Sequence, residues 1–140
     1  MSAYPTFSPD LVVEVTTACD RQCAGCYAPN VVGSPQDLRQ RPELFVKPEQ
    51  LKNSLEPLKD KNVRSIAIRG GEPTIHPQLE DVLTIVHSIS REVYLETHGK
   101  WLLNPVRAAK LETMSRLGTV VKLSHDPMHD SSEPELRQMI

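Results

Sequence analysis

Short apolar segments rich in β-branched residues alternate along this chain with segments of helical periodicity. The apolar segments predict strands over residues 11–16, 65–69, 93–99 and 119–126, and the periodic segments predict helices over residues 47–62, 77–90 and 104–117. Pro57 should bend or shorten the first of these helices. This order predicts a parallel sheet of about four strands with right-handed crossovers. We therefore expect an α/β fold, either an open sheet or an arc of a (βα) barrel.

Conspicuous polar or glycine-rich groups follow each expected strand. Cysteines follow the first strand, GGEP at residues 70–73 follows the second, THG at residues 97–99 ends the third, and SHD at residues 124–126 ends the fourth. In parallel α/β folds, ligands bind at the carboxyl ends of the strands. We therefore expect these four groups to line one edge of the sheet and to form the functional site.

The composition is that of a soluble globular protein. The 140 residues carry a net charge of −2, with 39% apolar and 24% charged residues, which predicts a single domain over residues 1–140. Residues 1–10 lack the features of a signal peptide, and no stretch approaches the ~20 apolar residues of a membrane span. We expect a cytoplasmic protein without a membrane partner, and no basic excess indicates nucleic acid.

All three cysteines, Cys19, Cys23 and Cys26, lie within residues 16–30. An odd number cannot be fully paired in disulfides, so the group is expected to bind metal or to react. The spacing would also suit one buried face of a helix, although Gly25 and the polar residues between the cysteines make a poor amphipathic helix. The metal could be zinc, with a histidine as fourth ligand, or an iron–sulfur cluster with one iron open to a small ligand.

The motif CxxxCxxC directly after a first strand, followed by GGEP after a second, resembles the radical S-adenosylmethionine (radical SAM) enzymes. THG is similar to the TNG often found after the third strand of that family. The resemblance implies a [4Fe-4S] cluster held by Cys19, Cys23 and Cys26, with S-adenosylmethionine chelating the fourth iron. The chain departs from the family in having Gly25 where a bulky or aromatic residue usually lies near the adenine, with Tyr27 after the third cysteine.

The resemblance also implies where S-adenosylmethionine is bound. The segment that receives the methionine amino group, through backbone carbonyl and carboxylate acceptors, corresponds to Gly70, Gly71 and Glu72, with Pro73 fixing the turn. Residues at the end of the fourth strand commonly touch the ribose or the carboxylate, and the matching positions are Ser124 and Asp126. Glycines let backbone acceptors approach a ligand amine closely, which agrees with this assignment.

A reaction and its partners follow from the same resemblance. An electron from the reduced cluster, supplied by a donor such as flavodoxin or ferredoxin, cleaves S-adenosylmethionine to methionine and a 5′-deoxyadenosyl radical. The radical abstracts hydrogen from an unknown small-molecule or peptide substrate. The family core has six strands, so four strands predict a partial barrel that is incomplete at the C-terminus and whose open edge invites association. The alternatives are a non-catalytic zinc or iron–sulfur module and an inactive truncated family member.

Five further residues have roles that the sequence addresses less directly. Glu96 and Lys122 are charges inside expected strands, and they either face solvent or point into the site. We expect His76 to help begin the helix after GGEP and His87 to be a helix histidine satisfied by a hydrogen bond. Trp101 is expected to pack a loop.

Overall fold

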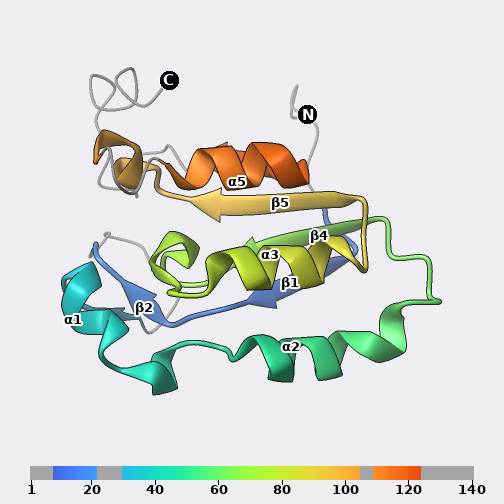
Figure 1. Ribbon diagram of the computed structural model, residues 1–140, viewed down its shortest axis with the longest axis horizontal. Coiled ribbons are helices and arrows are strands. Elements are labelled where there is room, and N and C mark those ends of the chain that lie inside the picture. The colour runs from blue at the N-terminus through green and yellow to red at the C-terminus, as the bar shows by residue number, and fades with distance from the viewer. Residues whose placement is uncertain (1–7, 22–29, 105–108, 124–140) are drawn as a thin grey trace, which may run out of the picture.

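A computed structural model describes residues 8–21, 30–104 and 109–123, and its centre is a parallel sheet (Figure 1). Within the described residues the sheet has four strands in the order β1-β4-β5-β6: β1 (Leu11–Glu14), β4 (Ser65–Arg69), β5 (Glu92–Thr97) and β6 (Val120–Leu123). Each neighbouring pair is parallel. The expected α/β fold with about four parallel strands is confirmed, and the carboxyl ends of the strands lie along one edge.

Helices connect these strands and cover one face of the sheet. They are α2 (Pro48–Leu55), α3 (Leu79–His87) and α5 (Lys110–Leu117). Figure 1 shows α3 between α2 and α5, and it contacts both. The first predicted helix is shortened as expected, because Pro57 lies in the 3-10 helix η2 (Glu56–Leu58) that follows α2. In the part of the chain that is described, no helix is long and apolar enough to cross a membrane.

A hydrophobic core fills the space between the sheet and these helices. Ile66 and Ile68 on the central strand β4 are fully buried, as are Val93 and Leu95 on β5. Helical side chains close the core from the other side: Leu51, Leu55, Val82, Leu83, Val86 and Met114. Burying side chains of this size contributes about 1.5–3 kcal/mol each, which makes the core the main support of the strand ends.

The opposite face of the sheet carries a row of alternating charges near the carboxyl ends. Successive strand residues point to opposite faces, so Glu96, next to the core residue Leu95, faces away from the helices. Glu14 pairs in register with Arg69, and Glu96 pairs with Lys122. The Glu96 carboxylate forms ion pairs with Arg69 and, at 3.5 Å, with the Lys122 ammonium. Glu96 and Lys122, whose orientation the sequence did not decide, therefore lie on the side of the sheet that a barrel would enclose.

The segment between the first cysteine and residue 47 holds short elements that the sequence analysis did not predict. Strand β2 (Ala18–Cys19) pairs in parallel with β3 (Val31–Val32). Helix α1 (Pro35–Arg39) follows, with Ser34 as its N-cap, and then the 3-10 helix η1 (Pro42–Leu44). Strands of two residues and a helix of five are too short to produce a periodic apolar pattern.

Helix α5 covers the C-terminal part of the helix predicted over residues 104–117. Helix α5 starts at Lys110, and Asn104 instead ends the 3-10 helix η4 (Lys100–Leu103), donating its N–H to Trp101 O at 3.1 Å. Residues 105–108 lie outside the described part of the chain. The N-cap of α5 is Ala109, and the start of the helix predicted from residue 104 is not tested by the described residues.

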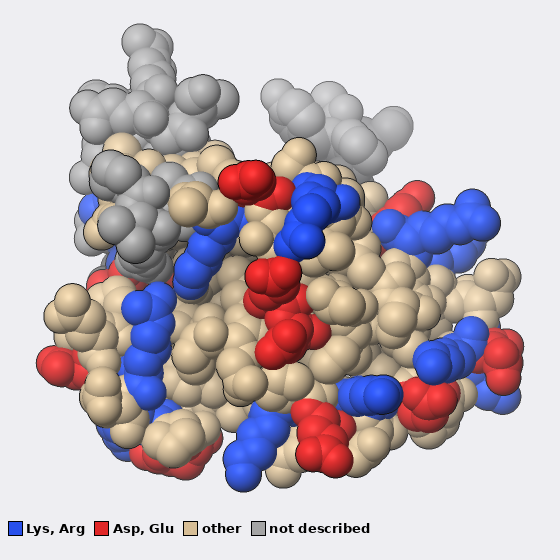
Figure 2. Space-filling model, viewed as in Figure 1, with Lys and Arg blue, Asp and Glu red and all other residues tan. Residues whose placement is uncertain are grey.

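Charges of both signs are interspersed on the helix-covered face (Figure 2). Arg116 contacts Glu80 at 2.7 Å between α5 and α3, and Lys59 contacts Glu56 at 3.3 Å. Because these side chains are about half exposed or more, each pair contributes at most about 1 kcal/mol. The core, and not these surface ion pairs, holds the strand ends in place.

Candidate functional site

Backbone hydrogen bonds hold the segment after β1 against the turn after β4. The Gly71 N–H donates to Thr16 O at 2.8 Å, and the Glu72 N–H donates to Ala18 O at 2.8 Å. A Cβ atom on Gly71 would lie 2.1 Å from Ala18 O, and one on Gly70 would lie 2.5 Å from Thr16 O. Glycine avoids both clashes, so the two glycines allow GGEP to contact the segment that leads into the first cysteine.

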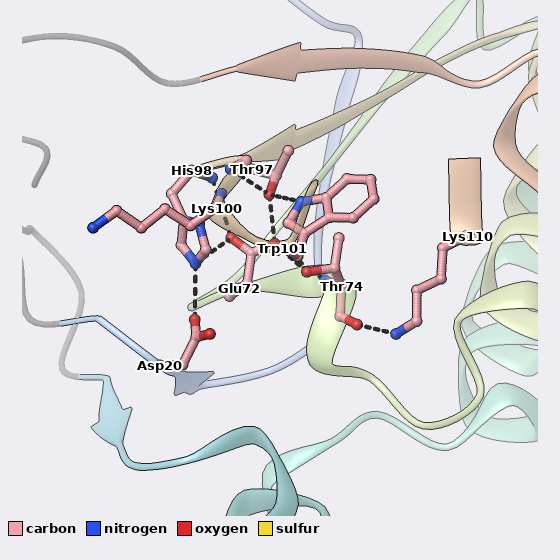
Figure 3. Close-up of polar contacts among 9 residues, drawn as sticks. Asp20, Glu72, Thr74, Thr97, His98, Lys100, Trp101 and Lys110 are labelled. Atoms are coloured by element: carbon pink, nitrogen blue, oxygen red, sulfur yellow. Dashed lines mark hydrogen bonds and ion pairs between the residues drawn. The ribbon is translucent and has the colours of Figure 1, made fainter. Parts of the chain in front are cut away.

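Glu72 is the buried centre of the site, with only 1% of its surface exposed (Figure 3). Its Oε1 accepts from the Thr74 N–H at 3.3 Å, from the Thr74 hydroxyl at 2.6 Å and from the Thr97 hydroxyl at 2.6 Å. Its Oε2 accepts from the His98 N–H at 3.1 Å and lies 3.2 Å from His98 Nε2. These contacts offset the cost of burying a carboxylate, and they join the GGEP turn to the end of β5.

Thr97, the last residue of β5, uses the full hydrogen-bonding capacity of its hydroxyl. The hydroxyl donates to Glu72 and accepts from the Gly99 N–H at 3.1 Å and from the Trp101 indole N–H at 2.7 Å. A hydroxyl has one donor and two acceptor positions, so all three are occupied. Trp101 is fully buried and belongs to the main core, which is a larger role than the loop packing expected from the sequence.

His98 lies between the GGEP turn and the cysteine segment. Its Nδ1 accepts the Lys100 N–H at 3.0 Å, which assigns the ring proton to Nε2. The Nε2–H points at Asp20 Oδ1 at 2.8 Å. Figure 3 shows the imidazole between the carboxylates of Asp20 and Glu72. Three strand ends are therefore linked by side chains as well as by backbone.

Of the predicted cluster ligands, the structure describes Cys19, which is buried at the end of β2. A Cβ atom built on Gly71 would lie 3.1 Å from the Cys19 Cβ, so this cysteine lies directly against GGEP. The other two predicted cluster ligands, Cys23 and Cys26, fall outside the described residues, as does Gly25. The predicted contacts Ser124 and Asp126 also fall outside them. The roles of these residues stay predictions, as do the contacts of Gly70 to Pro73 with S-adenosylmethionine.

The 3-10 helix η3 (Pro73–Ile75) is supported by cations from two other helices. The Arg39 Nε–H on α1 donates to Ile75 O at 3.0 Å, and the Lys110 ammonium on α5 donates to Thr74 O. Positive charge at the carbonyl end of a helical turn is favourable. The turn that contains GGEP is thus held both from the sheet and from the helical layer.

Two further histidines have local roles. His76 follows η3, and its Nδ1 accepts the N–H of Gln78, the N-cap of α3, at 3.0 Å while Nε2 lies 2.7 Å from Val46 O. His76 therefore helps to begin α3 as expected, and burial is the main cause that lowers its pKa. His87 lies 2.7 Å from the Thr119 hydroxyl, as expected of a satisfied helix histidine, and burial lowers its pKa too.

A family model described as the Radical SAM superfamily matches residues 13–140. The chain belongs to the radical SAM superfamily. It is also similar, at 26% identity over 109 residues, to a protein named "Probable GTP 3',8-cyclase" from Methanothermobacter marburgensis. The alignment covers 75% of this chain and 33% of that relative, so the chain spans about a third of the length of the curated relative that it matches.

The donor set of this radical SAM chain fits an iron–sulfur cluster. Cysteine thiolates are the usual ligands of such clusters, and Cys19 lies where β2 meets GGEP. Within residues 8–21, 30–104 and 109–123, no group of three histidine, cysteine, aspartate or glutamate side chains is arranged to hold a metal ion. Cys23 and Cys26, the other two predicted cluster ligands, lie outside that part of the chain.

The hydrogen bonds of the radical SAM site also bear on zinc as the alternative metal. His98, the histidine linked to the residue after Cys19, has both ring nitrogens in hydrogen bonds, to Lys100 and to Asp20. It could complete a site of three cysteines and one histidine only by giving up one of them. These hydrogen bonds thus count against His98 as the fourth ligand of a zinc site.

Proposed function

We propose that this chain is the cofactor-binding part of a radical SAM enzyme and holds a [4Fe-4S] cluster through Cys19, Cys23 and Cys26. When bound, the cluster and S-adenosylmethionine supply a one-electron cleavage that yields methionine and a 5′-deoxyadenosyl radical, which takes hydrogen from the substrate. A flavodoxin or ferredoxin is the class of partner that would deliver the electron.

The observation that carries this proposal is the contact between the cysteine segment and GGEP. The N–H groups of Gly71 and Glu72 donate to the backbone carbonyls of Thr16 and Ala18, in the segment that precedes Cys19. The element proposed to hold the cluster and the element proposed to hold S-adenosylmethionine are therefore adjacent in the fold, as two groups that bind each other require.

Each residue of GGEP has a distinct proposed role. Gly70 and Gly71 keep the turn close to the cysteine segment, and the backbone carbonyls of the turn accept from the methionine amino group. Glu72 orients this turn, because its two oxygens accept hydrogen bonds within the protein, so the proposal gives the contact with the amino group to the backbone carbonyls in place of the carboxylate expected from the sequence. Pro73 begins η3 and fixes the direction in which the chain leaves the turn.

The end of β6 and the charged face of the sheet are proposed to meet the rest of the ligands. Ser124 and Asp126 follow β6, and we assign them to the ribose or carboxylate of S-adenosylmethionine. The ion pairs among Arg69, Glu96 and Lys122 line the face away from the helices. A polar substrate, either a small molecule or a peptide, would suit such a surface better than an apolar one.

Anaerobic reconstitution with iron and sulfide tests the proposal. The reduced chain should show an electron paramagnetic resonance (EPR) signal of a [4Fe-4S] cluster, and S-adenosylmethionine should change that signal. The Cys23→Ala variant should lose the cluster, whereas Ser115→Ala on the exposed face of α5 should keep it. Preferential retention of zinc, or a signal that ignores S-adenosylmethionine, would contradict the proposal.

A further inference from the structure

His98 follows the last residue of β5, and its imidazole bridges two carboxylates that belong to two other strand ends. Its Nε2 lies 2.8 Å from Asp20 Oδ1 and 3.2 Å from Glu72 Oε2. The exposed fractions of the three side chains are 5% for His98, 15% for Asp20 and 1% for Glu72. The link is therefore largely shielded from water, where a hydrogen bond to a charged group is stronger than at an exposed position.

The backbone around His98 determines which way the ring donates. The Lys100 N–H donates to Nδ1 at 3.0 Å, so the ring carries its proton on Nε2. The His98 backbone N–H already donates to Glu72 Oε2 at 3.1 Å. The contact with Glu72 is thus made by the backbone as well, whereas the contact with Asp20 depends on the side chain at position 98.

The length of the histidine side chain is essential to this contact. The nitrogen of an asparagine side chain is one bond closer to the backbone than Nε2 of histidine, and that of glutamine is at the same number of bonds. From the backbone position of His98, we expect glutamine to reach Asp20 and asparagine to fall short. The TNG motif, which THG resembles, has asparagine at this place, so the link to Asp20 distinguishes this chain from that motif.

Asp20 is the residue next to Cys19, and the carbonyl of Ala18 accepts the Glu72 N–H. Ala18 precedes Cys19 and Asp20 follows it, so the two contacts together hold the chain on both sides of Cys19. We propose that His98 is a positioning residue that keeps the first cluster ligand and the S-adenosylmethionine-binding turn at a fixed separation. This inference rests on the proposed function, because it concerns how the same site is held.

The test compares His98→Asn with His98→Gln in the reconstituted 140-residue chain. The measurement is the concentration dependence with which S-adenosylmethionine changes the EPR signal of the reduced cluster. His98→Gln should bind close to the wild-type affinity. His98→Asn should bind about 10-fold more weakly, equivalent to about 1.4 kcal/mol. Both variants should contain the same iron and sulfide as the wild type, so the difference reports positioning and not cluster loss.

A second pair of variants tests the partner of His98. Asp20→Ala should weaken S-adenosylmethionine binding as much as His98→Asn does, and the double variant should be no weaker than either single one, because all three lack the same link. If His98→Asn does not fold, the Asp20→Ala variant alone tests the link: weaker S-adenosylmethionine binding supports it, and unchanged binding contradicts it. Additive effects, or an unchanged affinity in His98→Asn, would overturn the inference.

The outcomes separate this inference from the proposed function. If the wild-type cluster signal ignores S-adenosylmethionine, the proposed function fails and the inference fails with it. If the wild type responds and His98→Asn responds at the same concentrations, only the role of His98 is overturned. If His98→Gln is as weak as His98→Asn, the reach of the side chain is not what matters and the inference is again overturned.

Discussion

The Thr97 hydroxyl donates to Glu72 Oε1 at 2.6 Å, across a sequence separation of 25 residues. The two residues lie at the ends of β5 and β4, which are neighbours in the sheet. Both side chains are buried, and the same Thr97 oxygen accepts the indole N–H of the core residue Trp101. This hydrogen bond therefore connects the GGEP turn to the hydrophobic core and makes the geometry of the site dependent on the sheet.

Replacing Thr97 by valine should lower the free energy of unfolding by about 2 kcal/mol. Valine has nearly the same shape, but it leaves the Gly99 and Trp101 N–H groups without their acceptor and removes one of the donors to Glu72 Oε1. Urea unfolding followed by circular dichroism measures the change. Thr84→Val is the matched control, because Thr84 is exposed on α3 and should change stability by no more than about 0.5 kcal/mol. Equal midpoints for the two variants would contradict the role given to Thr97.

Gly71→Ala should be among the most destabilising single substitutions in this chain, at about 3 kcal/mol or more. The added Cβ would lie 2.1 Å from Ala18 O, a backbone atom that can move only with β2. Gly33→Ala is the control, because its nearest contacts are Leu38 side-chain atoms at 3.4 Å. The yield of soluble protein and the urea midpoint should fall for Gly71→Ala alone. Similar behaviour of the two variants would show that the close approach of GGEP to β2 is not required.

Glu96→Gln should cost about 1 kcal/mol of stability at low ionic strength, and added salt should reduce the difference. The Glu96 carboxylate is 18% exposed and pairs with Arg69 and with Lys122 on the face away from the helices. Glu80→Gln is the control, because the Glu80–Arg116 pair is more than half exposed and should contribute little. Urea unfolding at two salt concentrations measures both. A larger loss for Glu80→Gln would contradict the assignment of the stronger pair to the strand ends.

Stability should fall as the pH is lowered below about 6.5, the ordinary histidine pKa. Burial lowers the pKa of His76 and of His87 in the folded chain, so over this range the unfolded chain binds more protons than the folded one. The contribution of these two histidines to stability is therefore fully present above pH 6.5, and it is lost as the pH falls through their lower folded-state pKa values. Unfolding curves at pH 7.5 and 5.5 measure the effect. The double variant His76→Gln/His87→Gln should lose part of this dependence, and an unchanged dependence would contradict it.

The sequence predicted the β-α alternation and the functional edge because these features are local. The buried strand β4 has the apolar run Ile66, Ala67 and Ile68 at its centre, and α3 has apolar residues at helical spacing. Strand β2 and its partner β3 were missed because two residues carry no period. The chemical types in the cysteine motif and in GGEP pointed to the radical SAM superfamily, and the family match over residues 13–140 confirms that membership.

The contacts of His98, Thr97 and Trp101 could not be read from the sequence. THG and Trp101 were noticed, but their partners lie on other strands, and the register between β4 and β5 decides which side chains meet. The sequence did not predict a role for Asp20, because a single aspartate beside a cysteine forms no recognisable motif. The short reach of hydrogen bonds, about 3 Å, makes such contacts sensitive to tertiary placement.

The sequence by itself therefore determined the order of the main strands and helices, and its cysteine motif and GGEP indicated the family to which the chain belongs. Only the tertiary structure decided that Glu72 is buried and accepts from Thr97 and His98, and that His98 joins Asp20 to this group. The physical reason is that apolar periodicity acts within a segment, whereas the compensation of a buried charge requires donors that only the packed sheet brings together.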